Sequence, residues 1–384
     1  MAAGYSGVDC LRHTFAVGRQ KDCDELVSYL SNKYDGQAVL CKNGRSALAL
    51  ALMAYFEPGD AVIINGFTCY AVYEAVKAAK LKPVFADISK ESLNYTLESL
   101  EDVMADSSVV SKKNQDADFS GKGSYPDAVG KKPKGIIIQN TLGNPVDIVE
   151  IEKFAKKHDL VMIEDLAHCA GVRYRDGREV GTVGVAVAFS FGKDKSIDTV
   201  SGGALVLRDP CKKDIKAPSE SPKVSEHLRA RFYPLFGAIC RGLTYVKLGG
   251  ALMRLLVKIH FVERSADNRL DMTQRISKFE AKLALRQFKG LKKTGELPIR
   301  GFNLVRDRSE VLAKLRKAGY YFDGLWYEKP VSPERYYKKV HFPEAKCPVA
   351  VEVAEQIVNT PCYYSKKDLI GANKIISEYK EENE

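Results

Sequence analysis

The chain has 384 residues, of which 45% are hydrophobic and 28% are charged. This is the composition of an ordinary globular protein, and it excludes a collagen-like, a disordered or a disulfide-scaffold chain. Lys and Arg outnumber Asp and Glu by 59 to 49. The net charge of +10 suits a protein that binds anions, although a basic, solvated surface explains it equally well.

Nine cysteines are spread along the chain without a Cys-x-x-Cys pair. Their odd number and their spacing argue against a zinc site and against a secreted disulfide framework, so we expect a reducing, cytoplasmic location and no metal. Residues 1–20 lack the pattern of a signal peptide. No uncharged apolar stretch reaches about 18 residues, so no spanning helix is expected.

Residues 41–87 alternate between helical and strand patterns. The segment Asn43-Gly44-Arg45-Ser46 precedes a run of Ala and Leu that predicts a helix over 47–54. The next predicted elements are a strand at 61–64, a helix at 71–79 and a strand at 82–86. Such alternation predicts a mostly parallel sheet with helices on both faces.

Residues 107–134 are polar and predict a long surface loop. The alternation then resumes, with strands predicted at 135–139, 160–163, 185–191 and 203–207 and a helix at 148–158. We therefore expect a large α/β domain over residues 1–208.

Residues 209–272 differ in character. After a polar linker at 209–222, apolar residues recur at helical spacing on two successive helices, and Glu226 is the only acid between residues 222 and 260. Lys247, Arg254 and Lys258 fall on one helical stripe, which suits an anionic membrane surface. Packing against the core or a dimer partner is the alternative. A helix is predicted at 275–291, within a smaller α+β domain over 273–384.

Three segments carry side chains that make chemical sense together. Asp165, Ser190 and Lys195 follow predicted strands, where ligands bind in open α/β sheets. The segment Gly44-Arg45-Ser46 lies at a helix N-terminus, which favours phosphate. A lysine that can form a Schiff base, an acid and a phosphate cradle are what pyridoxal phosphate requires. A solvated lysine and a helix-capping aspartate are the plainer interpretation of the same residues.

The order and spacing of these segments resemble the DegT/StrS family of aminotransferases, which use pyridoxal phosphate and have fold type I. The matching elements are Ile163-Glu164-Asp165-Leu166-Ala167-His168, Gly181-Thr182-Val183-Gly184, Phe189-Ser190-Phe191-Gly192-Lys193-Asp194-Lys195 and Gly202-Gly203-Ala204. Weaker matches are Asn43 to Leu48, Pro58-Gly59-Asp60, Val84 to Asp87, Arg275 to Phe288 and Asn359-Thr360-Pro361. The resemblance covers most of residues 38–208 and patches of 272–375.

The resemblance implies a role for each matching residue. Lys195 would be the Schiff-base lysine and proton shuttle, and Asp165 would pair with the pyridine nitrogen. His168 would lie near the ring hydroxyl, unless it is simply a buried histidine. The implied phosphate-binding residues are Gly44, Arg45, Ser46 and Ser190. Cys69, with Tyr70 beside it, stands where the family stacks a side chain on the ring, although a small buried hydrophobe is an equal alternative.

The chain departs from the family pattern at Arg45, where a threonine is usual, and at Ser201 and Thr273. Some family members carry histidine instead of the lysine and are dehydratases, and Lys195 argues against that branch. The implied function is transfer of an amino group, with glutamate as donor, to a keto-sugar nucleotide or related carbonyl in surface polysaccharide or glycoconjugate synthesis. The implied assembly is a homodimer.

Two alternatives stay open. One is another fold-type-I lyase or desulfurase, in which Cys69 or Cys169 would act. The other is a regulatory protein on a retired enzyme fold that contacts a membrane through residues 223–260. Nucleic-acid binding is not expected, because no basic and aromatic motif accompanies the positive charge.

Overall fold

The structure is a computed structural model. It describes residues 7–106, 132–208, 211, 213–243, 248–259, 261–262, 269–291, 300–320, 322, 326–361 and 366–380. The predicted loop at 107–134 therefore lies outside the described residues, except for its last three positions.

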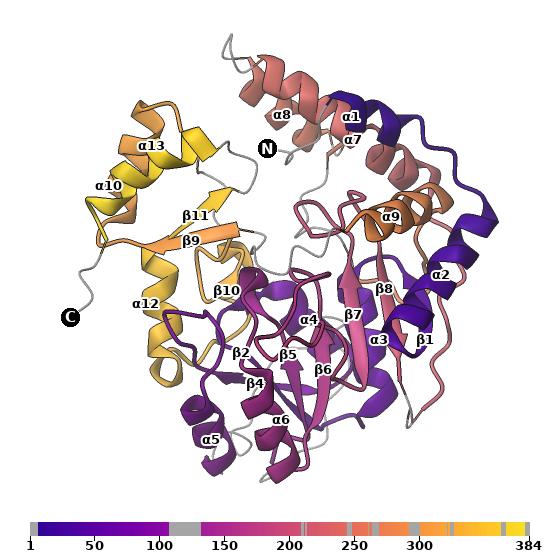
Figure 1. Cartoon of the computed structure of the whole chain (residues 1–384), viewed down its shortest axis with the longest axis vertical. Coiled ribbons are helices and arrows are strands. Elements are labelled where there is room, and N and C mark those ends of the chain that lie inside the picture. Colours follow the sequence, from indigo (N-terminus) through magenta and orange to yellow (C-terminus); the bar gives the residue numbers. More distant parts are fainter. Residues whose placement is uncertain are drawn as a thin grey trace.

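A seven-stranded sheet forms the centre of the molecule (Figure 1). Its strands, in spatial order, are β1 (Gln37–Cys41), β8 (Gly203–Leu207), β7 (Ala186–Ser190), β6 (Val161–Asp165), β5 (Gly135–Ile138), β2 (Ala61–Asn65) and β4 (Lys82–Ala86). Strand β8 runs antiparallel to both of its neighbours, and the other pairs are parallel. The mostly parallel α/β fold expected from the sequence is confirmed.

Helices cover both faces of the sheet, so each strand is buried on both sides. Val62 and Ile64 point into one hydrophobic core, and Ile63 points into the other. The first core is shared with α3 (Gly44–Tyr55), α4 (Tyr70–Ala78) and α12 (Pro348–Gln356). The second is shared with α2 (Gln20–Tyr34), α5 (Leu97–Ala105), α6 (Ile148–Lys157) and α9 (Lys278–Gly290).

Three further helices pack together beside a small third core. They are α1 (Gly7–Thr14), α7 (Val224–Gly242) and α8 (Gly249–Lys258). Tyr233 of α7 and Leu256 of α8 are buried in this core together with Phe279 of α9. No helix within the described part of the chain has the length and apolar character needed to cross a bilayer.

The C-terminal part is built on an antiparallel pair, β9 (Arg300–Leu304) and β11 (Ile357–Pro361), with α10 (Arg308–Lys317) and α13 (Lys366–Ser377). The segment between β9 and β11 returns to the large domain. There β10 (Val331–Ser332) pairs in parallel with β3 (Thr68–Cys69) in a separate two-stranded sheet and is followed by α11 (Glu334–Tyr337). This return brings residues 326–333 close to the ends of β6 and β7, where several of them line the same cavity.

The elements predicted between residues 41 and 207 agree with the structure within a few residues. The helix predicted at 275–291 begins later, because Ser277 caps it and forms a reciprocal capping box with Glu280. Elements α1, α2 and β1 had not been predicted. The division into three units at residues 208 and 272 stays a prediction.

Candidate active site

A cavity of about 250 Å³ opens where α3 begins and where β6 and β7 end. Its walls bring together residues that are far apart in the sequence. They include Gly44, Arg45, Cys69, Asp165, His168, Ser190, Lys193, Lys195 and Trp326. This is the carboxyl edge of the parallel strands, as the sequence predicted for the ligand site.

The start of α3 lies unusually close to the end of β7. Asn43 caps the helix by accepting a hydrogen bond from the Ser46 N–H at 2.8 Å. A Cβ atom on Gly44 would lie 2.6 Å from the Ser190 Cβ, and one on Gly203 would lie 2.5 Å from the Asn43 carbonyl carbon. Glycine at both positions therefore permits the first N–H groups of α3 and the Ser190 hydroxyl to border one space, which is suited to an anion.

Arg45 and Ser46 point in different directions. Arg45 lines the cavity, and its Nη1 lies 2.5 Å from Glu74 Oε2 on α4. Ser46 is fully buried, and its hydroxyl accepts a hydrogen bond from the Asp271 N–H at 3.0 Å. Ser46 is not among the residues that line the cavity, and its expected role at the cofactor stays a prediction. Its N–H serves the helix cap, and its side chain anchors the segment before α9.

Asp165 is the last residue of β6. Its Oδ1 accepts a hydrogen bond from the Ala167 N–H at 2.9 Å, which fixes the carboxylate at the cavity wall. Burial raises the pKa of Asp165, while the Ala167 N–H and the positive charge of Lys195 lower it.

Lys195, His168 and Trp326 meet inside the cavity. The Lys195 Nζ lies 2.9 Å from His168 Nε2 and 4.5 Å from the centre of the Trp326 ring. The imidazole of His168 also contacts the Trp326 ring, with 4.8 Å between ring centres. Its second nitrogen, Nδ1, accepts a hydrogen bond from the Leu142 N–H at 3.1 Å. His168 is thus held by backbone on one side and faces the lysine on the other.

Hydrogen bonds to Asp198 and Gln287 hold the turn that carries Lys195 in place. The Asp198 carboxylate accepts hydrogen bonds from the N–H groups of Asp194 and Val200, at 2.9 and 2.8 Å. The Gln287 side chain on α9 accepts from the Asp198 N–H at 2.9 Å and donates to its carbonyl at 2.7 Å. Asp194 has a positive φ of 63°, a backbone conformation that is uncommon for residues other than glycine and is found in tight turns.

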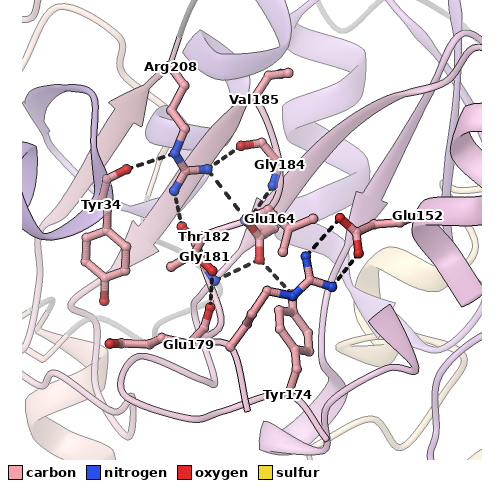
Figure 2. A network of polar contacts seen from close by, with 12 residues as sticks. Tyr34, Glu152, Glu164, Tyr174, Glu179, Gly181, Thr182, Gly184, Val185 and Arg208 are labelled. Atoms are coloured by element: carbon pink, nitrogen blue, oxygen red, sulfur yellow. Dashed lines mark hydrogen bonds and ion pairs between the residues drawn. The ribbon is translucent and has the colours of Figure 1, made fainter. Parts of the chain in front are cut away.

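Glu164 anchors the strand end next to Asp165 (Figure 2). Its fully buried carboxylate accepts hydrogen bonds from the Tyr174 hydroxyl at 2.6 Å and from the N–H groups of Gly181, Val183 and Gly184 at 2.7 to 2.9 Å. A side chain at Gly181 would collide with its neighbours, because a Cβ there would lie 2.7 Å from Leu166 Cδ2. The Gly-Thr-Val-Gly motif therefore binds the Glu164 carboxylate and supports the strand that carries Asp165.

The two residues expected near the cofactor ring have different positions. Cys69 is at the cavity wall, where its sulfur accepts a hydrogen bond from the Ala71 N–H at 3.5 Å. Tyr70 turns away and stacks on Tyr336 of α11, with 4.3 Å between ring centres. Only Cys69 of this pair faces the cavity.

These residues fit pyridoxal phosphate, the cofactor that the resemblance implies. The space between Gly44 and Ser190 borders helix N–H groups that suit a phosphate, and a Cβ at Gly44 would narrow it. Lys195 offers an amine for the aldehyde of the cofactor, and Asp165 offers a carboxylate for its ring nitrogen. The roles of the individual residues stay predictions.

Some residues of the site could not have been found from the sequence patterns. Trp326 reaches the cavity from the segment that returns through β10, about 130 positions after Lys195. Asp198 could have been noticed as an acid three residues after Lys195, but its bond to Gln287 depends on the packing of α9.

Comparisons with known proteins agree with this geometry. A profile of the DegT/DnrJ/EryC1/StrS aminotransferase family matches residues 23–218. GDP-perosamine synthase of Escherichia coli O157:H7 is 31% identical over 207 residues, which are 52% of this chain and 49% of that protein. The UDP-N-acetyl-3-dehydro-alpha-D-glucosamine 3-aminotransferase of Acidithiobacillus ferrooxidans is 31% identical over 196 residues, 50% of this chain and 46% of that protein.

The chain spans less than half the length of these curated relatives. Structural similarity extends further. The crystal structure of a DegT DnrJ EryC1 StrS aminotransferase from Brucella abortus superposes with a TM-score of 0.62, covering 96% of this chain and 92% of that one at 22% identity. The resemblance in fold thus covers both the large domain and the C-terminal part.

Proposed function

Because the chain belongs to the DegT/DnrJ/EryC1/StrS aminotransferase family, we propose that it is an aminotransferase that depends on pyridoxal phosphate. Its acceptor would be a keto-sugar nucleotide or a related carbonyl, and its donor glutamate, in surface polysaccharide or glycoconjugate synthesis. The names of two relatives, a GDP-perosamine synthase and a UDP-sugar 3-aminotransferase, support this class of acceptor.

One observation carries the proposal. The amine of Lys195, the carboxylate of Asp165 and the N-terminus of α3 face one cavity at the carboxyl edge of the sheet. Each of these three groups lies at or after the end of a different strand. The fold, and not one short motif, therefore brings them together.

Pyridoxal phosphate, when bound, supplies an aldehyde that takes up an amino group and a ring that accepts electron density. Lys195 would hold it covalently, and Asp165 would place a negative charge at its ring nitrogen. The N–H groups at the start of α3, with Arg45 and Ser190, would hold the phosphate. Lys195 Nζ, as a neutral amine, would also take up and return the proton that transamination moves.

The proposal includes a homodimer and a cytoplasmic location at the inner face of a membrane, with contact through residues 223–260. A homodimer follows the pattern of the family and is tested by light scattering during size-exclusion chromatography. A scattering mass of one chain, close to 42.6 kDa, would contradict it.

The function is tested by absorbance spectroscopy of the purified protein. We expect a visible band on addition of pyridoxal phosphate, and we expect glutamate to shift it into the near ultraviolet. In Lys195→Ala the cofactor should no longer become fixed to the chain by borohydride. No visible band, or fixation that persists in Lys195→Ala, would refute the proposal. Release of sulfide and alanine from cysteine would favour the desulfurase alternative instead.

A further inference from the structure

Helices α1, α7 and α8 lie together at one end of the molecule, opposite α5 and α6 (Figure 1). Helices α7 and α8 bury one side in a core shared with α9, and α1 packs its buried side against α7. We use the term "docking face" for the exposed apolar side chains on these helices and in the residues directly beside them. These are Val8, Leu11, Phe15, Val17, Val224, Leu228, Ile239, Leu248, Leu255 and Ile259.

Helix α1 shows the division most clearly. Its residues Cys10 and His13 face α7, where they contact the carbonyl oxygens of Pro234 and Ala230 at 3.4 and 3.1 Å. Leu11 and Phe15 lie on the other side, and Phe15 is 72% exposed. The apolar spacing of Val8, Leu11 and Phe15 is that of one helical stripe.

Helix α8 repeats this arrangement. Leu256 is buried against α7, whereas Leu248, Leu255 and Ile259 are 58%, 53% and 59% exposed and follow one another at helical spacing. The helix is therefore apolar on two sides, and only one of them is covered by the described residues.

The concentration of such side chains is unusual. The described residues include 14 large apolar side chains that are exposed, and the docking face contains 10 of them. The other four, Met53, Leu97, Val149 and Ile370, are scattered over four different helices. Scattered apolar residues are normal on a soluble protein, but a gathered set indicates an interaction surface.

The charges around the docking face select the kind of partner. Lys223, directly before α7, and Arg254 and Lys258 on α8 are exposed. The single acid among the described residues of these two helices, Glu226, is paired with Lys42 at 3.0 Å. Apolar stripes bordered by lysine and arginine match a bilayer with anionic headgroups, because the two contributions to binding then act together.

We propose that the docking face binds the surface of an anionic membrane, with its apolar side chains at the headgroup boundary and its basic side chains at lipid phosphates. The inference rests on the membrane contact in the proposed function, and it adds α1, which the sequence did not indicate, to the binding surface. Helices α7 and α8 would lie along the membrane and would not cross it.

This surface is one layer away from the candidate active site. The Lys193 Nζ, two residues before Lys195, lies 3.9 Å from the centre of the Tyr233 ring on α7. A membrane bound to the docking face would therefore hold the cavity close to the lipid surface.

The test uses the full chain with pyridoxal phosphate and measures co-sedimentation with vesicles. We expect binding to phosphatidylcholine vesicles that contain phosphatidylglycerol and weak binding to phosphatidylcholine alone. The double variant Leu255→Ser with Ile259→Ser should weaken binding by about tenfold or more. Each of Arg254→Glu and Lys258→Glu should weaken it by roughly fivefold or more at low salt.

Ile370→Ser is the matched control, because Ile370 is also 72% exposed but lies on α13, outside the docking face. It should bind vesicles as the unmodified chain does. Equal binding of the double variant and the unmodified chain would overturn the proposal. Conversion of a dimer to a monomer by the double variant, without a change in vesicle binding, would show that this face joins two copies instead.

The test is independent of catalysis. The visible band with pyridoxal phosphate should be the same in all four docking-face and control variants, since none of these side chains lines the cavity. Loss of vesicle binding with this band intact would support the docking face. Vesicle binding without any band would refute the proposed enzyme but not the membrane contact.

Discussion

Lys195 and His168 form a hydrogen bond whose direction is fixed by a third group. The Leu142 N–H donates to His168 Nδ1, so this nitrogen carries a lone pair and the imidazole proton is on Nε2. The Nε2–H can then donate to Lys195 Nζ, 2.9 Å away, when the amine is neutral. This contact favours the neutral form of the lysine, which is the nucleophilic one.

We expect His168→Phe to shift the pH dependence of cofactor attachment toward higher pH, because the amine loses the donor that favours its neutral form. His168→Gln keeps an N–H donor and should restore much of the original profile. The measurement is the visible absorbance with pyridoxal phosphate as a function of pH. Identical profiles for His168→Phe and the unmodified chain would contradict this role.

Arg45 should increase affinity for the phosphate of the cofactor. It lines the cavity beside the start of α3, and Glu74 holds its guanidinium in place. We expect Arg45→Ala to weaken pyridoxal phosphate binding by about tenfold or more, the worth of one charge-assisted hydrogen bond. Trp326, the single tryptophan of the chain, reports binding by its fluorescence.

Pyridoxal without the phosphate is the control for Arg45. Its affinity should be the same for Arg45→Ala and the unmodified chain, because pyridoxal lacks the group that Arg45 would contact. If both ligands lose affinity equally, Arg45 supports the cavity wall and does not contact the phosphate.

Glu164 should matter for stability much more than a surface carboxylate in the same network. Its carboxylate accepts four hydrogen bonds in full burial, so Glu164→Gln leaves donors without their acceptor. We expect a loss of about 3 kcal/mol in the free energy of unfolding. Glu152→Gln, which breaks a half-exposed pair with Arg178, should cost less than about 1 kcal/mol. Urea unfolding measures both, and equal losses would contradict the argument.

The sequence predicted the centre of the site because local patterns encode it. Asp165 and Lys195 follow strands whose apolar runs are easy to recognise, and parallel strands place their ends together. The helix of Gly44 was recognisable from its run of Ala and Leu. The comparisons confirm the family and the fold, and the individual roles stay predictions.

The rest depended on contacts between distant segments. Trp326 enters the cavity only because β10 pairs with β3, and no pattern near residue 326 indicates this. Ser46 belongs to the predicted phosphate segment, but its N–H donates to Asn43 and its hydroxyl accepts from the Asp271 N–H. Helix α1 is short and lies against α7, so its position depends on tertiary packing and not on propensity.

His13 should make the attachment of α1 sensitive to acid. It is buried between α1 and α7, with Nε2 against the Ala230 carbonyl oxygen. Burial, with a contribution from the positive charge of Arg231, lowers the pKa of His13 from 6.5 to about 4, although the Ala230 carbonyl raises it. The unfolded chain therefore binds a proton near pH 6.5 and the folded chain only near pH 4.

The sign follows directly: the stability that neutral His13 contributes is complete above pH 6.5 and is lost as the pH falls toward 4. The free energy of unfolding should drop by up to about 3 kcal/mol across this window. His13→Gln can still donate to the Ala230 carbonyl but cannot take up a proton, so its urea-unfolding stability should fall less steeply. Other acid-sensitive groups affect the unmodified protein and His13→Gln equally. If the free energy of unfolding falls equally steeply with pH in both, His13 has an ordinary pKa in the folded protein.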